Sequence, residues 1–237
     1  MDNYSFAFQP LVDVSRRRCV GFEALVRGPA GESAGHVLAS VGKTPEGLLD
    51  FDTAARSRAI ALAVDIGLPP DVFLSLNLLP ESLAAKGDEP LQATMNAIKK
   101  AGISPRQVMV EVSESQRISD FAQFYAITDV YKAQGLRFSV DDFGAGYAGL
   151  NMLAEFQPEL IKLDMGLLER VWERGPRQAI IRGVIRTCED LGIDVVAEGV
   201  ESVEQYRWLL DENVVMFQGY LFARPQFQAF PEVTYPA

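Results

Sequence analysis

The sequence predicts an α/β fold: a TIM-like (β/α)8 barrel whose first strand is irregular and antiparallel to its neighbour. Eight short runs rich in β-branched and aromatic residues recur along the 237 residues, and most are separated by segments with helical periodicity. Strands that alternate with helices favour right-handed βαβ units and a parallel sheet. A chain of this length is also the usual size of a single barrel. We therefore expect residues 1–237 to form one domain.

The expected strands cover residues 4–12, 19–26, 72–79, 107–114, 136–142, 159–164, 194–200 and 215–222. Only the segment VDVSRRR separates the first two strands, and it is too short for a helical crossover. These two strands are therefore predicted to pair as an antiparallel hairpin. From the third strand onward, we expect a helix after each strand.

Three helices are clearest in the spacing of apolar residues. The first ends at Gly67 and Pro69, and its predicted buried face consists of Phe51, Ala55, Ala59, Leu62 and Ile66. The second opens at Pro176 and stops at Gly192, and its predicted buried residues are Ile180, Ile181, Val184, Ile185, Cys188 and Leu191. The third starts near Ser202.

The composition excludes several classes of protein. A net charge of −10 and a pI of about 4.7 leave no basic surface for duplex nucleic acid or an anionic membrane. Cys19 and Cys188 lack metal-type spacing and are expected to be reduced core residues of a cytosolic protein. No apolar run approaches the roughly 20 residues that span a bilayer, and the first ten residues do not resemble a signal peptide. Because strand-like sequence begins at once, we expect either a naturally minimal protein or an excised domain.

Seven of the eight expected strands carry a strongly polar residue inside or near the end of the run. These residues are Glu23, Asn77, Glu111, Asp141 with Asp142, Lys162, Glu198 and Gln218. Strands covered on both faces are normally almost continuously apolar. Polar residues near the carboxyl ends of barrel strands usually face the mouth, where barrel enzymes place their chemistry. Each residue alone fits a solvated strand end or a salt bridge, but seven on successive strands favour one shared site.

Five of these groups are carboxylates, which would raise one another's pKa values unless cations offset the repulsion. Hard oxygen ligands with one carboxamide suit Mg²⁺ or Mn²⁺ rather than a structural zinc ion. The only histidine, His36, lies in a loop of small residues, so no Ser-His-Asp arrangement is available. Adjacent Asp141 and Asp142 can hold two ions if Asp141 bridges them. Two such ions suit the activation of water for in-line attack at phosphorus.

Eight motifs, in order along the chain, resemble a known family. They are FQP at Phe8, EALVR at Glu23, LNLLP at Leu76, VEVSES at Val110, DDFGAGY at Asp141, IKLD at Ile161, AEGVES at Ala197 and QGYLFARP at Gln218. Together they resemble the EAL family of cyclic di-GMP phosphodiesterases. The resemblance implies hydrolysis of cyclic di-GMP to linear pGpG with two Mg²⁺ or Mn²⁺ ions. Ca²⁺ is expected to inhibit, because it prefers longer bonds to oxygen and more ligands than Mg²⁺. The resemblance also implies a homodimer.

The resemblance assigns roles to individual residues. One metal ion would be bound by Glu23, Asn77, Glu111 and Asp141, and the second by Asp141 and Asp142. The catalytic residues would be Lys162, which contacts the attacking water and could assist its deprotonation, Glu198 beside the second metal, and Asp142. The substrate would be bound by Gln9, Leu25, Arg27, Pro80, Asp164 and Gln218. Glu114 would anchor the loop that follows Asp142.

The chain departs from the family pattern in that loop, where Ala145, Ala148 and Gly149 replace hydroxyl residues. The family uses this loop to couple the dimer interface to the metal site, so the departure bears on coupling more than on chemistry. The alternative function is a catalytically inactive member of the fold that binds cyclic di-GMP or a protein partner. Such members are expected to lose metal ligands, whereas every matched ligand is present here. A third possibility is a barrel enzyme that acts on another phosphodiester.

Overall fold

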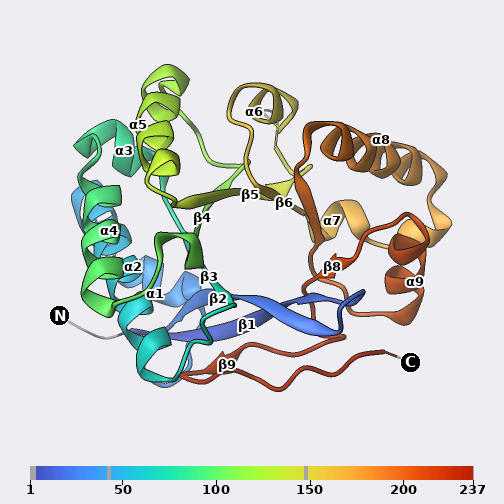
Figure 1. The fold of residues 1–237 in the computed structure, drawn as a ribbon, viewed down its shortest axis with the longest axis horizontal. Helices are drawn as coiled ribbons and strands as arrows, with labels where there is room; N and C mark the ends of the chain where they lie inside the picture. Colours follow the sequence, from blue (N-terminus) through green and yellow to red (C-terminus); the bar gives the residue numbers. More distant parts are fainter. Residues whose placement is uncertain (1–3, 42–43, 147–148, 237) are drawn as a thin grey trace.

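The computed structural model describes residues 4–41, 44–146 and 149–236, and within these ranges eight strands close into a barrel (Figure 1). Ala148, one of the altered loop positions, lies outside the described residues. The strands are β1 (Ser5–Asp13), β2 (Arg18–Arg27), β3 (Phe73–Asn77), β4 (Val108–Ser113), β5 (Arg137–Phe143), β6 (Leu160–Leu163), β7 (Asp194–Ala197) and β8 (Met216–Phe217). The predicted α/β barrel is confirmed.

Strand β1 runs against the other seven strands. Strands β2 to β8 are parallel neighbours in chain order, and β1 pairs antiparallel with both β2 and β8, which closes the barrel. The predicted hairpin of β1 and β2 is therefore confirmed, with Gln9 opposite Glu23. The chain leaves β8 through a turn, not through the expected helix, and forms the short strand β9 (Gln226–Phe227), which pairs with β1.

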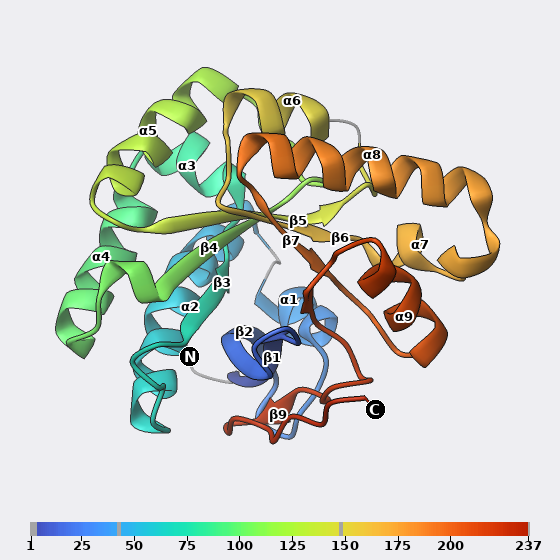
Figure 2. The same cartoon turned by 45° about the vertical axis from the view of Figure 1, so that its right-hand side comes forward.

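Helices cover the outside of the barrel (Figures 1 and 2). They are α1 (Ala34–Val41), α2 (Pro45–Asp65), α3 (Pro80–Lys86), α4 (Glu89–Ala101), α5 (Phe121–Ala133), α6 (Gly149–Glu155), α7 (Met165–Leu168), α8 (Gly175–Leu191) and α9 (Val203–Asp211). His36, expected in a loop, lies exposed in α1. In the part of the chain that the structure describes, no helix combines the length and apolarity needed to cross a lipid bilayer.

The predicted face of helix α2 packs against the core, with Ala59 buried and Phe51, Ala55, Leu62 and Ile66 partly buried. The fully buried residues of this helix lie beside that face and are Asp52, Arg56, Ala59, Ile60 and Ala63. One predicted face is wrong in detail. In α8, Ile180 and Leu191 are 56% and 44% exposed instead of buried. Adjacent residues of a helix point about 100° apart, so only Ile181 of the Ile180–Ile181 pair can face the barrel.

The barrel interior changes from apolar to polar along its axis. Its floor is a small cluster of buried residues: Leu11, Phe73, Met109, Leu160 and Val196. Side chains alternate between the two faces of a strand, so the residue two positions nearer the mouth also points inward. Those next residues are Gln9, Ser75, Glu111, Lys162 and Glu198. A separate and larger apolar cluster packs the outside of the barrel against the helices.

In the part of the chain that the structure describes, no helix connects β1 to β2; helix α1 contacts one end of the hairpin, and the C-terminal segment packs on it as well. In Figure 1 the segment that contains β9 runs along the outer side of β1 and β2. The Phe230 ring stacks on Phe22 with a centroid separation of 4.2 Å and meets the Phe8 ring edge-on at 5.1 Å. The hairpin therefore buries its outward aromatic side chains under residues far away in the sequence.

Candidate active site

Lys162 on β6 is the centre of the polar layer. Its side chain is 0% exposed, and its Nζ contacts four carboxylates that project from four other strands or strand ends. The distances are 3.0 Å to Glu23 Oε2, 3.3 Å to Glu111 Oε2, 3.3 Å to Asp141 Oδ1 and 2.5 Å to Glu198 Oε1. The structure thus brings together the carboxylates that the sequence placed on separate strands.

The cluster strongly perturbs its own ionisation. Burial raises the pKa of Glu111 to about 8, with Lys162 opposing the shift and neighbouring carboxylates adding to it. Burial likewise raises the pKa of Glu198 well above its ordinary value. Burial opposes the charged form of Lys162, but the surrounding carboxylates outweigh it and hold its pKa well above the usual range. In the metal-free protein, Lys162 is therefore an ammonium, and the raised pKa values of Glu111 and Glu198 favour the neutral forms of these two carboxyl groups.

A β-bulge explains how two adjacent aspartates can serve one site. In a regular strand Asp141 and Asp142 would point to opposite faces. Here the register with β6 shifts between Val140 and Phe143, and Asp142 has a φ of 55°. Asp142 Oδ2 accepts a hydrogen bond of 2.8 Å from Ser113 Oγ, which fixes its direction. Both carboxylates consequently reach the mouth of the barrel.

The carboxylates form two groups of three that share Asp141. Glu23, Glu111 and Asp141 make one group, and Asp141, Asp142 and Glu198 make the other, with one ligand atom of each residue within 4.8 Å of the others. Among the described residues, Glu111 Oε1 is buried without a hydrogen-bond partner. An orphaned buried carboxylate oxygen and an all-oxygen donor set fit hard divalent cations such as Mg²⁺ or Mn²⁺.

Amide side chains border the first group. Asn77 lies exposed at the end of β3, with its Nδ2 3.5 Å from Glu23 Oε1. Buried Gln218 donates through Nε2 to Glu23 Oε2 at 2.7 Å and to Gln9 Oε1 at 3.3 Å. Both oxygens of Glu23 therefore accept a hydrogen bond from an amide. Among the described residues none donates a hydrogen bond to the Asn77 carboxamide oxygen, which can therefore act as a ligand.

A cleft of about 330 Å³ opens above the carboxylates. Of the expected substrate-binding residues, Gln9, Leu25, Asp164 and Gln218 line it. Asp164 also caps α7, where its Oδ1 accepts from the main-chain N–H of Gly166 at 2.9 Å. The remaining lining residues are Glu23, Asp141, Asp142, Met165, Glu198, Gly199, Glu201, Gly219 and Tyr220.

Two expected substrate-binding residues do not line this cleft. Arg27 Nη1 donates to the carbonyl oxygen of its neighbour Val26 at 2.8 Å. Pro80 is buried in the first turn of α3 and lines a small pocket against α5. For both residues, a role in binding remains a prediction from the resemblance.

Glu114 holds the loop that follows the double aspartate. Its Oε2 accepts from the main-chain N–H groups of Gly144 and Gly146 at 2.7 and 3.1 Å. Its Oε1 accepts from that of Gly149 at 2.6 Å. A Cβ atom at Gly149 would lie 2.7 Å from Glu114 Oε1, so the glycine permits a close approach that a serine would hinder.

Sequence reasoning missed several residues of the site. Ser113 orients Asp142, Glu201 and Tyr220 line the cleft, and the buried pair Asp52–Arg56 contacts the end of β3. Glu201 lies within the AEGVES motif, which is a signal that could have drawn attention to it. The Asp52–Arg56 pair carries a weaker signal, because opposite charges four residues apart usually mark a solvated helix face.

Comparison with known proteins agrees with this geometry. The family model described as the EAL domain matches residues 1–225. The chain is similar to the blue light- and temperature-regulated antirepressor BluF of Escherichia coli K12, with 38% identity over 237 residues that cover 99% of this chain and 57% of BluF. It is also similar to the cyclic di-GMP phosphodiesterase RocR of Pseudomonas aeruginosa, with 35% identity over 155 residues, 65% of this chain and 39% of RocR.

Among solved structures, the chain is similar to Klebsiella pneumoniae BlrP1 in a manganese and cyclic di-GMP complex at pH 9.0. The identity is 39% and the TM-score 0.92, over 98% of this chain and 58% of that one. The chain therefore spans little more than half the length of BluF and BlrP1.

Proposed function

Because the chain belongs to the EAL domain family, we propose that it hydrolyses the second messenger cyclic di-GMP to linear pGpG in a metal-dependent reaction. The observation that supports this most is the pair of carboxylate groups that share Asp141 at the mouth of the barrel. A protein that only bound the ligand would not need so costly a concentration of buried negative charge. The RocR and BlrP1 likenesses support the same substrate.

In this proposal Glu23, Asn77, Glu111 and Asp141 hold one divalent ion, and Asp141 and Asp142 hold the second. Two bound ions would supply positive charge for the phosphate and lower the pKa of the attacking water. The protein alone cannot offer the substrate this attraction, since its cleft is lined by carboxylates and its net charge is −10.

Lys162 and Glu198 orient and deprotonate the attacking water. Lys162 Nζ lies 3.3 Å from Oδ1 of Asp141, the carboxylate common to both groups, so the lysine would orient the attacking water for loss of a proton. Glu198 contacts Lys162 and opens to the cleft with 17% of its side chain exposed. Its carboxylate is therefore placed to accept that proton. Gln9, Leu25, Asp164 and Gln218 position the dinucleotide above this pair.

The test is incubation of the purified 237-residue chain with cyclic di-GMP and Mg²⁺ or Mn²⁺, with separation of the products by chromatography. We expect pGpG to accumulate, and an Asp141→Asn variant to produce none because it loses the ligand common to both groups. Tight binding of cyclic di-GMP without product, with either ion, would contradict the enzymatic function.

That outcome would favour the second candidate, a non-enzymatic receptor for cyclic di-GMP or a protein partner. The specific observation in its favour is the 38% identity to BluF, which is described as an antirepressor. The homodimer remains a proposal that rests on the family resemblance, and the cytoplasmic location remains one that rests on the two cysteines.

A further inference from the structure

Helix α2 carries a buried ion pair directly behind the candidate active site. Arg56 and Asp52 are 2% and 6% exposed, and Arg56 Nη1 lies 2.7 Å from Asp52 Oδ2. A buried ion pair is weak evidence for a stabilising role, because removing two charges from water costs about as much as their attraction returns. Its retention in an otherwise apolar interface needs another explanation, and the partners of the pair provide one.

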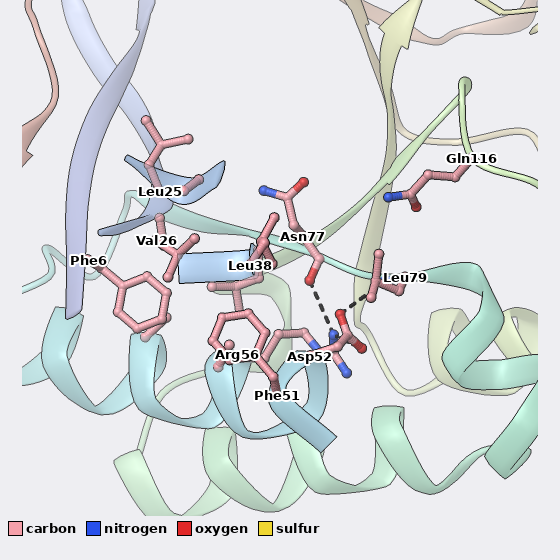
Figure 3. Close-up of a pocket in the computed structure, with 15 residues that line it drawn as sticks. Phe6, Leu25, Val26, Leu38, Phe51, Asp52, Arg56, Asn77, Leu79 and Gln116 are labelled. Atoms are coloured by element: carbon pink, nitrogen blue, oxygen red, sulfur yellow. Dashed lines mark hydrogen bonds and ion pairs between the residues drawn. The ribbon is translucent and has the colours of Figure 1, made fainter. Parts of the chain in front are cut away.

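Arg56 binds the main chain of a candidate metal ligand. Its Nη1 donates to the carbonyl oxygen of Asn77 at 3.2 Å, and its Nε donates to Thr94 Oγ1 on α4 at 3.0 Å. Figure 3 shows Arg56 and Asp52 beneath Asn77, with dashed lines to the end of β3. The planar guanidinium thus fixes Asn77 relative to two helices, which a single-point ammonium cannot do.

Asp52 holds the next part of the same segment. Its Oδ1 accepts from the main-chain N–H of Leu79 at 3.0 Å, and its Oδ2 accepts from Ser82 Oγ at 2.8 Å. Strand β3 ends at Asn77, and the main-chain hydrogen bond from Leu78 N–H to the carbonyl oxygen of Glu111, at 2.9 Å, still joins the next residue to β4. The ion pair on α2 therefore holds residues 77–79 at two points, the carbonyl oxygen of Asn77 and the main-chain N–H of Leu79.

The Asn77 side chain depends on this main-chain support. Its only hydrogen bond among the described residues is the 3.5 Å contact from Nδ2 to Glu23 Oε1, which is at the limit of a hydrogen bond. Residues outside the ligand shell that orient ligands typically change metal affinity by about 10–100-fold when they are mutated.

We propose that Asp52 and Arg56 are positioning residues that orient Asn77 for metal binding. The inference rests on the proposed function, because it needs a metal ion at the group formed by Glu23, Glu111 and Asp141. It adds to that function a link from α2, through the main chain of β3, to the ion. A pocket of about 260 Å³ adjoins both residues and Asn77, so there is room for a substituted side chain without overpacking.

The test measures binding of Mn²⁺ alone, by calorimetry or by electron paramagnetic resonance of the free ion, without substrate. Arg56→Lys keeps the positive charge beside Asp52 but loses the planar fork. We expect it to weaken Mn²⁺ binding about 10-fold or more. The matched control is Arg182→Lys, which alters a comparable pair between Arg182 and Glu212 on the surface. We expect the control to bind Mn²⁺ as the unaltered protein does.

A second comparison separates positioning from a general structural role. If Arg56 acts through Asn77, Arg56→Lys should weaken Mn²⁺ binding less than about twofold when it is added to Asn77→Ala. Circular dichroism and the urea midpoint confirm that each variant is folded, and Arg56→Gln with Asp52→Asn replaces Arg56→Lys if that variant unfolds.

Unchanged Mn²⁺ affinity in folded Arg56→Lys would overturn the inference while leaving the proposed function intact. An equal loss of affinity with and without Asn77 would do the same. Failure of the unaltered protein to bind Mn²⁺ would instead overturn the proposed function and the inference together.

Discussion

Replacing Lys162 with methionine tests the electrostatic account of the site. The substitution roughly keeps the volume of the side chain but removes the cation that contacts four carboxylates at 2.5–3.3 Å. Removing one partner of a buried ion pair costs about 3–5 kcal/mol, because the remaining charge is left uncompensated. We expect the metal-free Lys162→Met variant to lose about this much of its free energy of unfolding at neutral pH. That is a large share of the roughly 5–15 kcal/mol typical of a domain.

The loss of unfolding free energy in the Lys162→Met variant should be smaller at acidic pH. Burial raises the pKa of Glu111 from 4.5 to about 8, and removal of Lys162 raises it further. A carboxyl group with a higher pKa in the folded than in the unfolded protein binds more protons when folded. Its contribution to stability therefore falls as the pH rises from 4.5 through 8. The unaltered protein shares this dependence, because Glu111 has a raised pKa there too. The extra gain of the variant comes from the other carboxyl groups around residue 162, which lose the ammonium that keeps them ionised and can take up protons in the folded state between about pH 8 and about pH 5.

Mn²⁺ should also restore stability, because an added cation compensates the same carboxylates. The assay is urea unfolding followed by circular dichroism, at both pH values and with or without Mn²⁺. Lys132→Met is the matched control, since Lys132 is a partly buried lysine that contacts main-chain carbonyl oxygens at residues 156 and 157. An equal loss for Lys162→Met at both pH values, unaltered by Mn²⁺, would refute the electrostatic reasoning.

Glu23→Ala and Asp141→Ala should each abolish pGpG formation and leave the fold intact. The stability of the metal-free protein should be unchanged or higher, because repulsion between carboxylates is relieved. Turnover near that of the unaltered protein would contradict the assignment of these residues as metal ligands. Lys162→Met should lower turnover by about 10²–10³-fold, the usual cost of removing one positioned hydrogen-bond donor, with a much smaller effect on cyclic di-GMP affinity. Loss of affinity alone would make Lys162 a phosphate contact. Calcium should bind yet give no product, and it should inhibit the manganese enzyme. The reason is that Ca²⁺ prefers oxygen ligands at about 2.3–2.6 Å, whereas Mg²⁺ prefers them at about 2.0–2.1 Å. Equal turnover with calcium would count against the two-metal mechanism. Phe230→Ala should lower the free energy of unfolding by about 1–3 kcal/mol, whereas Phe227→Ala, at a side chain that is 38% exposed, should lower it much less; similar losses would mean that the C-terminal cover is not anchored by Phe230.

The correct predictions concern features that depend on the alternation of side chains along a strand and on the order of strands and helices along the chain. Polar residues near the ends of consecutive strands converge because parallel strands of a barrel end at one mouth. The same alternation places Lys162 two residues above Leu160 of the floor, and Glu111 two residues above Met109. The antiparallel first strand followed from the length of a single connection.

Features that depend on side-chain direction could not be predicted in this way. The bulge that turns both aspartates to the mouth leaves no mark in the apolar pattern, because Asp142 needs only a left-handed φ. The predicted face of α2 was incomplete because a charged pair, Asp52 with Arg56, is fully buried beside its apolar residues. Arg27 illustrates the same limit, since the motif fixes its position in the chain but not where its guanidinium points.

Closure of the barrel brings together segments that are synthesised at very different times. Gln9 and its partner Gln218 are separated by 209 residues, and a ribosome adds about 5–20 residues per second. The first hairpin therefore waits roughly 10–40 s for the strand beside it and for the aromatic cover over Phe8 and Phe22. During that interval its apolar outer face and one strand edge are open to other nascent chains. Chaperone demand and aggregation during expression should thus depend on translation speed between Arg27 and Gln218, and little on the speed through the hairpin itself.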